Sequence, residues 1–221
     1  MKRIGGVLLV LVVCAAPAIA AKPPPKPPKG NPNLTIGSSA SAVTFGRTVT
    51  LSGTAKNTAA GTAVEAQANP FPYSGFKSTG KTGVVDPNGN YSIPGVVVSM
   101  NTQFRVSAKT SPPSESPAVF VRVRLRVSFK VSDSTPKRGA LVRFSGRVAP
   151  AHDGKPVLIQ KKTASGYKTV ARTTMVDNGS ATSKYSKRVK IRRSGTYRVI
   201  AESVDQDHQN GTSRARILKV H

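Results

Sequence analysis

The stretch Gly46-Arg-Thr-Val-Thr-Leu-Ser-Gly53 occurs a second time, 93 residues later, as Gly139-Ala-Leu-Val-Arg-Phe-Ser-Gly146. Both copies begin and end with Gly, place apolar residues at alternate positions and close with Ser-Gly. An alternation with a period of two predicts a β-strand with one face on a hydrophobic core, and the flanking glycines predict turns. The fold is therefore expected to use one strand pattern twice.

Other segments repeat at the same or nearly the same shift. Residues 61–67 align with 154–160, and 103–106 align with 196–199. Small changes of shift fall at turn residues, as expected for loops that tolerate insertions. The repeat predicts two modules, at residues 34–124 and 125–221.

Each module contains seven candidate strands, and no segment keeps a helical period. The first set lies near 34–37, 47–56, 62–70, 75–85, 90–98, 102–109 and 118–124. The second set lies near 125–132, 140–149, 155–163, 166–176, 181–191, 195–204 and 213–220. The spacing of the turn signals predicts an all-β protein with two tandem antiparallel β-sandwiches of the immunoglobulin type.

Alternation also predicts which side chains face the two cores. In the first module these are Val49, Leu51, Val64, Tyr91, Ile93, Phe104, Val106, Val119 and Val121. In the second they are Val142, Phe144, Val157, Ile159, Tyr185, Tyr197, Val199 and Ile217. Tyr197, near the start of a sixth strand, is in the place of the tyrosine corner of such sandwiches, whereas Phe104 occupies the matching place without a hydroxyl.

The order of these motifs resembles the tandem immunoglobulin-like repeats of bacterial secreted and surface proteins. It consists of Gly-x-x-Val-x-Leu-Ser-Gly, then Gly-x-x-Val, then Asp with Asn-Gly, then Tyr or Phe before Arg-Val, and it covers residues 34–221. The resemblance implies a spacer, adhesion or wall-associated module. It implies no catalytic activity, because a fold alone does not specify function.

The N-terminal residues have the features of an export signal. A basic start, an apolar run over 7–14 and small residues around Ala18 and Ala20 predict a signal peptide at 1–20. Lipidation of Cys14 is the less favoured alternative, since Val13 departs from a lipoprotein box. Residues 21–33, rich in Pro and Lys, predict a stiff cationic linker. These features predict a secreted or extracellular protein, either free or associated with the cell envelope. The mature chain is expected to have no transmembrane segment.

The charge is the strongest compositional signal. The 221 residues carry 34 Lys and Arg against nine Asp and Glu, a net charge of +25. Residues 31–124 have a net charge of +5, and residues 125–221 have +15. Such a surface attracts nucleic acid, anionic lipid or the phosphate- and uronate-bearing polymers of cell walls. The alternative is that the charge is incidental.

The positive charge concentrates in residues 184–193, where six of ten residues are basic. The candidate anion-binding residues are Arg143, Arg147, Lys161, Lys162, Lys184, Lys187, Arg188, Lys190, Arg192 and Arg193. Lys and bidentate Arg suit phosphate and carboxylate groups. Few aromatic residues are interleaved with them, so sequence-specific reading of nucleic acid is not expected.

No residue pattern predicts an enzyme, a cofactor or a metal site. His152, His208 and His221 lack the spacing of zinc ligands and are expected on the surface. Residues 205–211 resemble a calcium loop, but Arg216 stands where its last ligand would be, so a polar loop is predicted. A secreted hydrolase would need a carboxylate pair or a triad, neither of which is evident.

Two functions follow from these observations. The first is a secreted, non-enzymatic protein, at the cell surface or wall, that binds anionic envelope polymers or other polyanions through the basic second module. The alternative is a passive structural spacer, or an adhesion module whose partner is another protein bound at sheet edges or loops.

Overall fold

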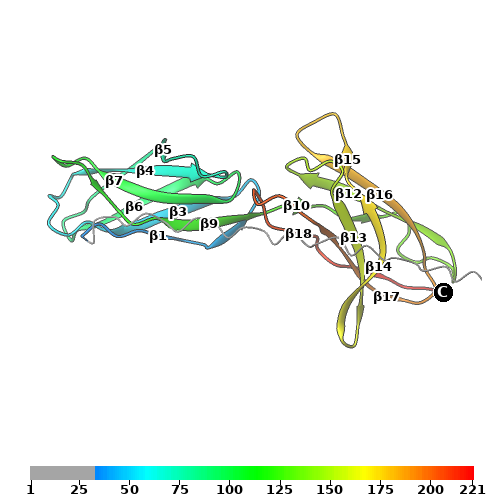
Figure 1. The fold of residues 1–221 in the computed structure, drawn as a ribbon. Coiled ribbons are helices and arrows are strands. Elements are labelled where there is room, and N and C mark those ends of the chain that lie inside the picture. The colour runs from blue at the N-terminus through cyan, green and yellow to red at the C-terminus, as the bar shows by residue number, and fades with distance from the viewer. Residues whose placement is uncertain (1–32) are drawn as a thin grey trace, which may run out of the picture.

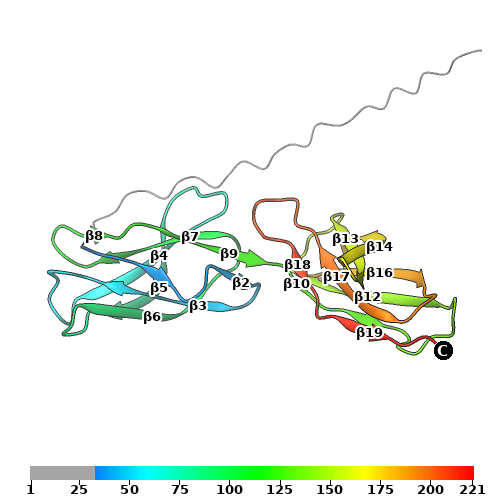
Figure 2. The same cartoon turned by 90° about the horizontal axis from the view of Figure 1, so that it is seen from below.

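The computed structural model describes residues 33–221, which form two β-sandwiches placed end to end (Figure 1, Figure 2). The predicted signal peptide at 1–20, Cys14 within it and nearly all of the predicted linker at 21–33 lie outside the described residues. We call the unit that contains β1 to β9 the first sandwich and the unit that contains β10 to β19 the second sandwich.

The first sandwich has a three-stranded and a six-stranded sheet. The smaller sheet has the order β1 (Gly37–Ser38), β3 (Thr48–Thr54), β6 (Asn90–Val97). The larger has the order β2 (Ala42–Thr44), β9 (Val119–Arg124), β7 (Thr102–Ala108), β4 (Ala63–Pro70), β5 (Lys77–Val84), and β8 (Ser114–Glu115) pairs with β7.

The second sandwich has two five-stranded sheets. One has the order β10 (Arg126–Val127), β12 (Leu141–Ala149), β16 (Ser183–Lys190), β15 (Val176–Asp177), and β11 (Lys130–Val131) also pairs with β12. The other has the order β14 (Gly166–Thr174), β13 (Pro156–Thr163), β17 (Gly195–Ala201), β18 (Gly211–Thr212), and β19 (Arg216–Leu218) also pairs with β17.

The all-β prediction is confirmed, and each long strand lies within its predicted range. One pair of strands departs from the predicted antiparallel arrangement: β2 runs parallel to β9, with Val43 opposite Val123. Each sandwich also has its own hydrophobic core. The first core ends with Val123 and the second begins with Leu125, so no buried residue belongs to both.

The predicted core is confirmed at all but two positions. Val119 is only partly buried, although it packs against the first core. The prediction for Ile217 is wrong: its side chain is 64% exposed, and its neighbour Leu218 is fully buried. Because successive side chains of a strand point to opposite faces, an error of one residue exchanges the two roles.

The two glycines that bound the repeated stretch have separate roles. Gly46 and Gly139 have φ angles of 85° and 87°, a left-handed conformation that costs glycine little. Gly53 and Gly146 provide space instead. A Cβ atom on Gly146 would lie 2.0 Å from the carbonyl oxygen of Ser128 and 2.6 Å from the Tyr185 hydroxyl. The pattern therefore encodes a turn at one end and a close approach at the other.

In each sandwich a tyrosine side chain packs over this glycine, where a Cβ atom would collide with the tyrosine hydroxyl. Tyr185 lies opposite Gly146 in the β12–β16 pair, and its hydroxyl donates a hydrogen bond of 2.7 Å to the carbonyl of Ser128. Tyr91, opposite Gly53, makes the same bond to the carbonyl of Thr35. The sequence analysis missed these two bonds, which differ from the tyrosine corner expected at Tyr197 because they join residues 57 and 56 positions apart.

Residues around the junction join the two sandwiches directly. Asn101, between β6 and β7, donates from its backbone N–H to the carbonyl of Asp207 at 2.7 Å and from its amide to the carbonyl of Gln206 at 2.7 Å. Its side-chain oxygen accepts from the N–H of Val123 at 2.8 Å. The loop between β17 and β18 is therefore held against the first sandwich.

Candidate functional site

The outer face of β12 and β16 carries five exposed cationic residues that we call the cationic face. They are Arg143, Arg147, Lys184, Arg188 and Lys190. The strands place them together because Arg143 lies opposite Arg188 and Arg147 lies opposite Lys184, without a bulge between. Val142, Phe144, Val148 and Tyr185 at inward positions of the same strands are buried, so alternation directs all five side chains away from the core.

Like charges therefore stand directly opposite each other at two outward pairs, which are separated by the neutral outward pair Ser145 and Ser186. The Cβ atoms of such pairs lie about 4.5–5.5 Å apart, where like charges destabilise a sheet. Among residues 33–221, no carboxylate forms an ion pair with any residue of the cationic face. The acid nearest to it along the sheet, Asp177, accepts a hydrogen bond of 2.8 Å from the N–H of Gly179.

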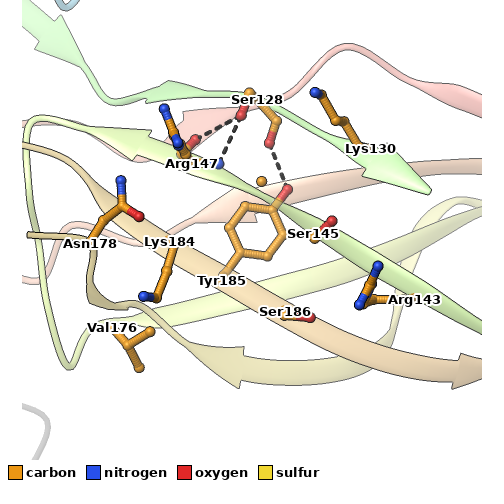
Figure 3. A pocket seen from close by; sticks show the side chains of 11 residues that line it. Ser128, Lys130, Arg143, Ser145, Arg147, Val176, Asn178, Lys184, Tyr185 and Ser186 are labelled. Carbon is orange, nitrogen blue, oxygen red and sulfur yellow. Dashed lines mark hydrogen bonds between the residues drawn. The ribbon is translucent and has the colours of Figure 1, made fainter. Parts of the chain in front are cut away.

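A shallow groove of about 630 Å³ runs along this face (Figure 3). Its cations are Arg143, Arg147 and Lys184 together with Lys130. Polar groups lie between them, contributed by Ser128, Ser145, Ser186 and Asn178. The groove thus combines positive charge with neutral hydrogen-bonding side chains, a combination suited to phosphate or carboxylate groups along a chain.

Lys130 was missed by the sequence analysis. It lies on β11 opposite Ser145, which is an outward position of β12. Arg126, Ser128 and Lys130 are exposed, whereas Val127, Phe129 and Val131 are partly or fully buried. This alternation is visible in the sequence and could have added Lys130 to the candidate residues.

The corresponding face of the first sandwich is neutral. Thr54 lies opposite Asn90 where the second sandwich has Arg147 opposite Lys184, and Thr50 occupies the place of Arg143. The local framework is otherwise retained. The Thr54 N–H donates to the hydroxyl of Thr35, and the Arg147 N–H donates to the hydroxyl of Ser128, each at 2.8 Å. The cations were therefore not required by the fold.

The remaining candidate residues lie elsewhere on the second sandwich. Lys161, Arg192 and Arg193 surround a second hollow of about 370 Å³, which Lys190 also lines. The Lys161 ammonium donates to the carbonyl of Arg193 at 3.1 Å and stands 5.5 Å from the centre of the Tyr197 ring. A cation near an aromatic face is stabilised electrostatically. This hollow is distinct from the groove of the cationic face.

Lys162 and Lys187 belong to neither hollow. Lys162 is opposite Tyr167 on the sheet that does not contain the cationic face. Lys187 is opposite Phe144, so it occupies a position of inward parity, although its side chain is exposed. The ten candidate residues therefore form two groups with two outliers instead of one stripe.

Two of the three histidines are buried, which corrects the prediction that all are on the surface. His152 is 7% exposed and His208 is 6% exposed. His208 Nδ1 lies 2.9 Å, and His152 Nε2 lies 3.5 Å, from the same oxygen, Oδ2 of Asp207. Burial alone would raise the pKa of Asp207, but hydrogen bonding and charge from His208, and then from His152, lower that pKa overall. The Asp207 side chain is therefore held as a carboxylate.

The cluster His152, Asp207 and His208 also contacts the first sandwich. His208 Nε2 lies 2.8 Å from the carbonyl oxygen of Ser99, and the His208 ring packs edge-on against Phe45 with centroids 6.0 Å apart. Local spacing could not reveal the cluster, because 56 residues separate the two histidines and the loops meet only in the folded chain.

Comparisons with known proteins give no family assignment. No family model matches the sequence, and no curated protein matches it either.

Among residues 33–221, no helix has the length and apolar character needed to cross a lipid bilayer.

Solved structures that are similar include a tetra-tandem repeat in the extending region of a large adhesion protein, with 18% identity and a TM-score of 0.38 over 84% of this chain. They also include the Yersinia pseudotuberculosis adhesin InvE, with 10% identity and a TM-score of 0.34 over 84% of this chain. The chain spans only 49% and 58% of those two structures.

Proposed function

We propose that the protein is a secreted, non-enzymatic module of the cell surface or wall that binds anionic polymers through the cationic face. The observation that carries the proposal is the pair of like-charged contacts, Arg143 opposite Arg188 and Arg147 opposite Lys184. These contacts oppose folding, and the same fold positions are neutral in the first sandwich. A bound polyanion would remove the repulsion, because each phosphate or carboxylate would accept hydrogen bonds from these side chains.

The shape of the site supports a polymer as the ligand. The groove is open and lies along the sheet, and its cations are spread over β11, β12 and β16. An open surface of this kind suits a chain with repeated charges, because many weak contacts act together. Few aromatic rings are available there for base stacking, which favours a wall-type polymer with phosphate or uronate groups over single-stranded nucleic acid.

The test compares two variants that lose the same charge. In the first, Arg143→Thr, Arg147→Thr and Lys184→Asn replace three cations by the residues of the first sandwich. In the second, Lys168→Gln, Arg172→Gln and Lys219→Gln remove three exposed cations that lie outside the cationic face. Retention on isolated bacterial cell envelopes is then measured as the salt concentration is raised.

The proposal predicts that the first variant is released at a lower salt concentration than the wild type and the second variant. Equal loss in both variants would mean that only net charge matters. Retention that is insensitive to salt and unchanged in the first variant would instead support the alternative function, a spacer or a module that binds another protein.

A further inference from the structure

The cluster His152, Asp207 and His208 presents three ligand atoms that face one another. These atoms are Nε2 of His152, one carboxylate oxygen of Asp207 and Nδ1 of His208, and all lie within 4.8 Å of one another. The Asp207 oxygen lies 3.5 Å from His152 Nε2 and 2.9 Å from His208 Nδ1. Ligands about 2.0–2.2 Å from a tetrahedral zinc ion are separated by roughly 3.3–3.6 Å. The spacing therefore fits a metal ion with only small shifts of the side chains.

Backbone carbonyls fix the tautomers of both rings. His208 Nε2 lies 2.8 Å from the carbonyl oxygen of Ser99, and His152 Nδ1 lies 3.2 Å from that of Pro150. A carbonyl can only accept, so each of these ring nitrogens must carry the proton. The opposite nitrogens, His152 Nε2 and His208 Nδ1, then present lone pairs in the neutral rings. Hydrogen bonding of the distal nitrogen to a carbonyl is the usual support of a metal-bound histidine.

Those two lone pairs are buried without a hydrogen-bond donor. In the neutral rings His152 Nε2 and His208 Nδ1 have no hydrogen-bond partner, since only the protonated rings can donate to Asp207, and both side chains are at most 4% exposed. They point at a carboxylate oxygen, which is also an acceptor. The other oxygen of Asp207 is 3.4 Å from the hydroxyl of Ser203, which can donate to it. With both rings protonated, their two N–H groups would donate to the Asp207 carboxylate; with both rings neutral, a divalent cation would satisfy all three ligand atoms together.

The surroundings of the cluster carry both signs of charge, since Arg124 lines the nearby hollow and Lys155 pairs with Asp205 at 3.2 Å. Acidic residues of the second module gather near the cluster, since Asp153, Glu202 and Asp205 lie on the same loops or next to them. Asp153 accepts a hydrogen bond from Ser183, which in turn accepts from the N–H of His152. A surface hollow of about 590 Å³ reaches His208, and the Asp207 side chain is 25% exposed. An ion could therefore enter from solvent.

From these contacts we propose that His152, Asp207 and His208 bind one divalent transition-metal ion of the zinc class at the junction of the two sandwiches. Two imidazoles and one carboxylate form a ligand set suited to zinc, and a water molecule would complete the coordination. The ion would tie the loop after β12 to the loop between β17 and β18. Through Ser99 it would also hold the first sandwich, so the metal is expected to stiffen the junction.

The decisive test reads the histidine nitrogens of the wild-type protein directly. The tag-free full chain, labelled with ¹⁵N and stripped of metal by a chelator, is followed by two-dimensional NMR of the imidazoles as Zn²⁺ is added. We expect His152 Nε2 and His208 Nδ1 to change their chemical shifts at one equivalent of zinc, while exposed His221 does not respond. Unchanged shifts for His152 and His208, or a response confined to His221, would overturn the proposal.

Variants provide the matched comparison. Asp207→Asn and His152→Ala each remove one ligand, whereas His221→Ala removes the histidine outside the cluster. Zinc affinity is measured by competition with a chromophoric chelator. Each ligand variant should lose more than about 100-fold in zinc affinity, the largest loss expected when a residue that only hydrogen-bonds to a ligand is replaced. His221→Ala should bind zinc like the wild type. Equal affinity in all of them would contradict the proposal, and if a ligand variant fails to fold the wild-type NMR titration decides.

Discussion

Arg143 on β12 stands directly opposite Arg188 on β16, on the outer face of the second sandwich, and neither side chain has a carboxylate partner within residues 33–221. Four residues further along β12, Arg147 stands opposite Lys184, with the pair Ser145 and Ser186 between the two charged pairs. The corresponding β3–β6 pair of the first sandwich, whose register shifts between Val49 and Leu51, carries no charge at these positions. The repulsion is therefore a property of the second sandwich that its fold does not require.

Replacement of Arg147 by Thr, the residue at the equivalent position of the first sandwich, is expected to stabilise the protein. Removing one member of a like-charged cross-strand pair should raise the free energy of unfolding by about 0.5 kcal/mol at low salt. Urea denaturation of Arg147→Thr and wild type measures the difference, which should shrink in about 1 M salt because the charges are screened. A variant that is less stable than the wild type at low salt would contradict repulsion between Arg147 and Lys184.

Loss of the Tyr185 hydroxyl is expected to destabilise the second sandwich. In Tyr185→Phe the carbonyl of Ser128 loses its 2.7 Å donor, which should cost about 1 kcal/mol of unfolding free energy. Tyr91→Phe should have a similar effect in the first sandwich. Tyr167→Phe is the control, because Tyr167 contacts Arg198 through its ring face, 3.8 Å from the guanidinium carbon. Equal stability of Tyr185→Phe and Tyr167→Phe would mean that the bond contributes nothing.

Alkaline pH should unfold the protein partly through the same tyrosines. Burial raises the pKa of Tyr91 and of Tyr185 well above the usual value for tyrosine. The unfolded chain ionises these groups near about pH 10, whereas the folded chain keeps them neutral, so their stabilisation is complete below that pH and is lost as the pH rises above it. Each contributes a slope of about 1.4 kcal/mol per pH unit in that window.

Denaturation curves recorded between about pH 8 and 12 test the sign and the source of this dependence. The slope for Tyr185→Phe should be smaller than that of the wild type, because one of the two buried tyrosines no longer titrates. Lysine ionisation is common to both proteins and cancels in the comparison. An identical slope would show that Tyr185 ionises normally in the folded state.

The last strand offers a direct test of its register. Leu218 is fully buried and Ile217 is 64% exposed. Leu218→Ala should therefore cost about 2–5 kcal/mol, through lost burial and a cavity. Ile217→Ser should change stability by no more than about 0.5 kcal/mol. Thermal unfolding of the two variants measures these losses. A larger loss of stability in Ile217→Ser than in Leu218→Ala would show that Ile217 faces the core, as the sequence predicted.

The sequence was sufficient to predict the strands and their buried faces where a pattern extends over many residues. The long strands β3 and β12 were predicted because alternation holds over the whole repeated stretch, and the copy confirmed its limits. The three residues of β19 are too few to fix a face, so Ile217 was placed inside. The short parallel strand β2 carries no signal of its own, since its pairing with β9 depends on tertiary packing.

The candidate sites show the same contrast between local and distant information. The alternation of β12 and β16 predicts exposed cations on both strands, but which of the ten candidates share a face, and the opposite pairing of Arg143 with Arg188, required the structure. The cluster His152, Asp207 and His208 joins two loops that are far apart in the sequence. Its one available signal is a difference between the repeats, because residue 59, the counterpart of His152 in the first module, is Ala.

The central claim is that the cationic face, rather than net charge, binds anionic polymers. Its most direct test is the salt dependence of binding to polyphosphate of defined length, measured for the wild type and two triple variants. The first variant combines Arg143→Thr, Arg147→Thr and Lys184→Asn. The matched variant combines Lys168→Gln, Arg172→Gln and Lys219→Gln. Loss of three contacts should reduce the slope of log K against log salt by about 2, by analogy with single-stranded nucleic acid. We predict this reduction for the first variant and a wild-type slope for the matched variant; equal slopes for the two variants would contradict the claim.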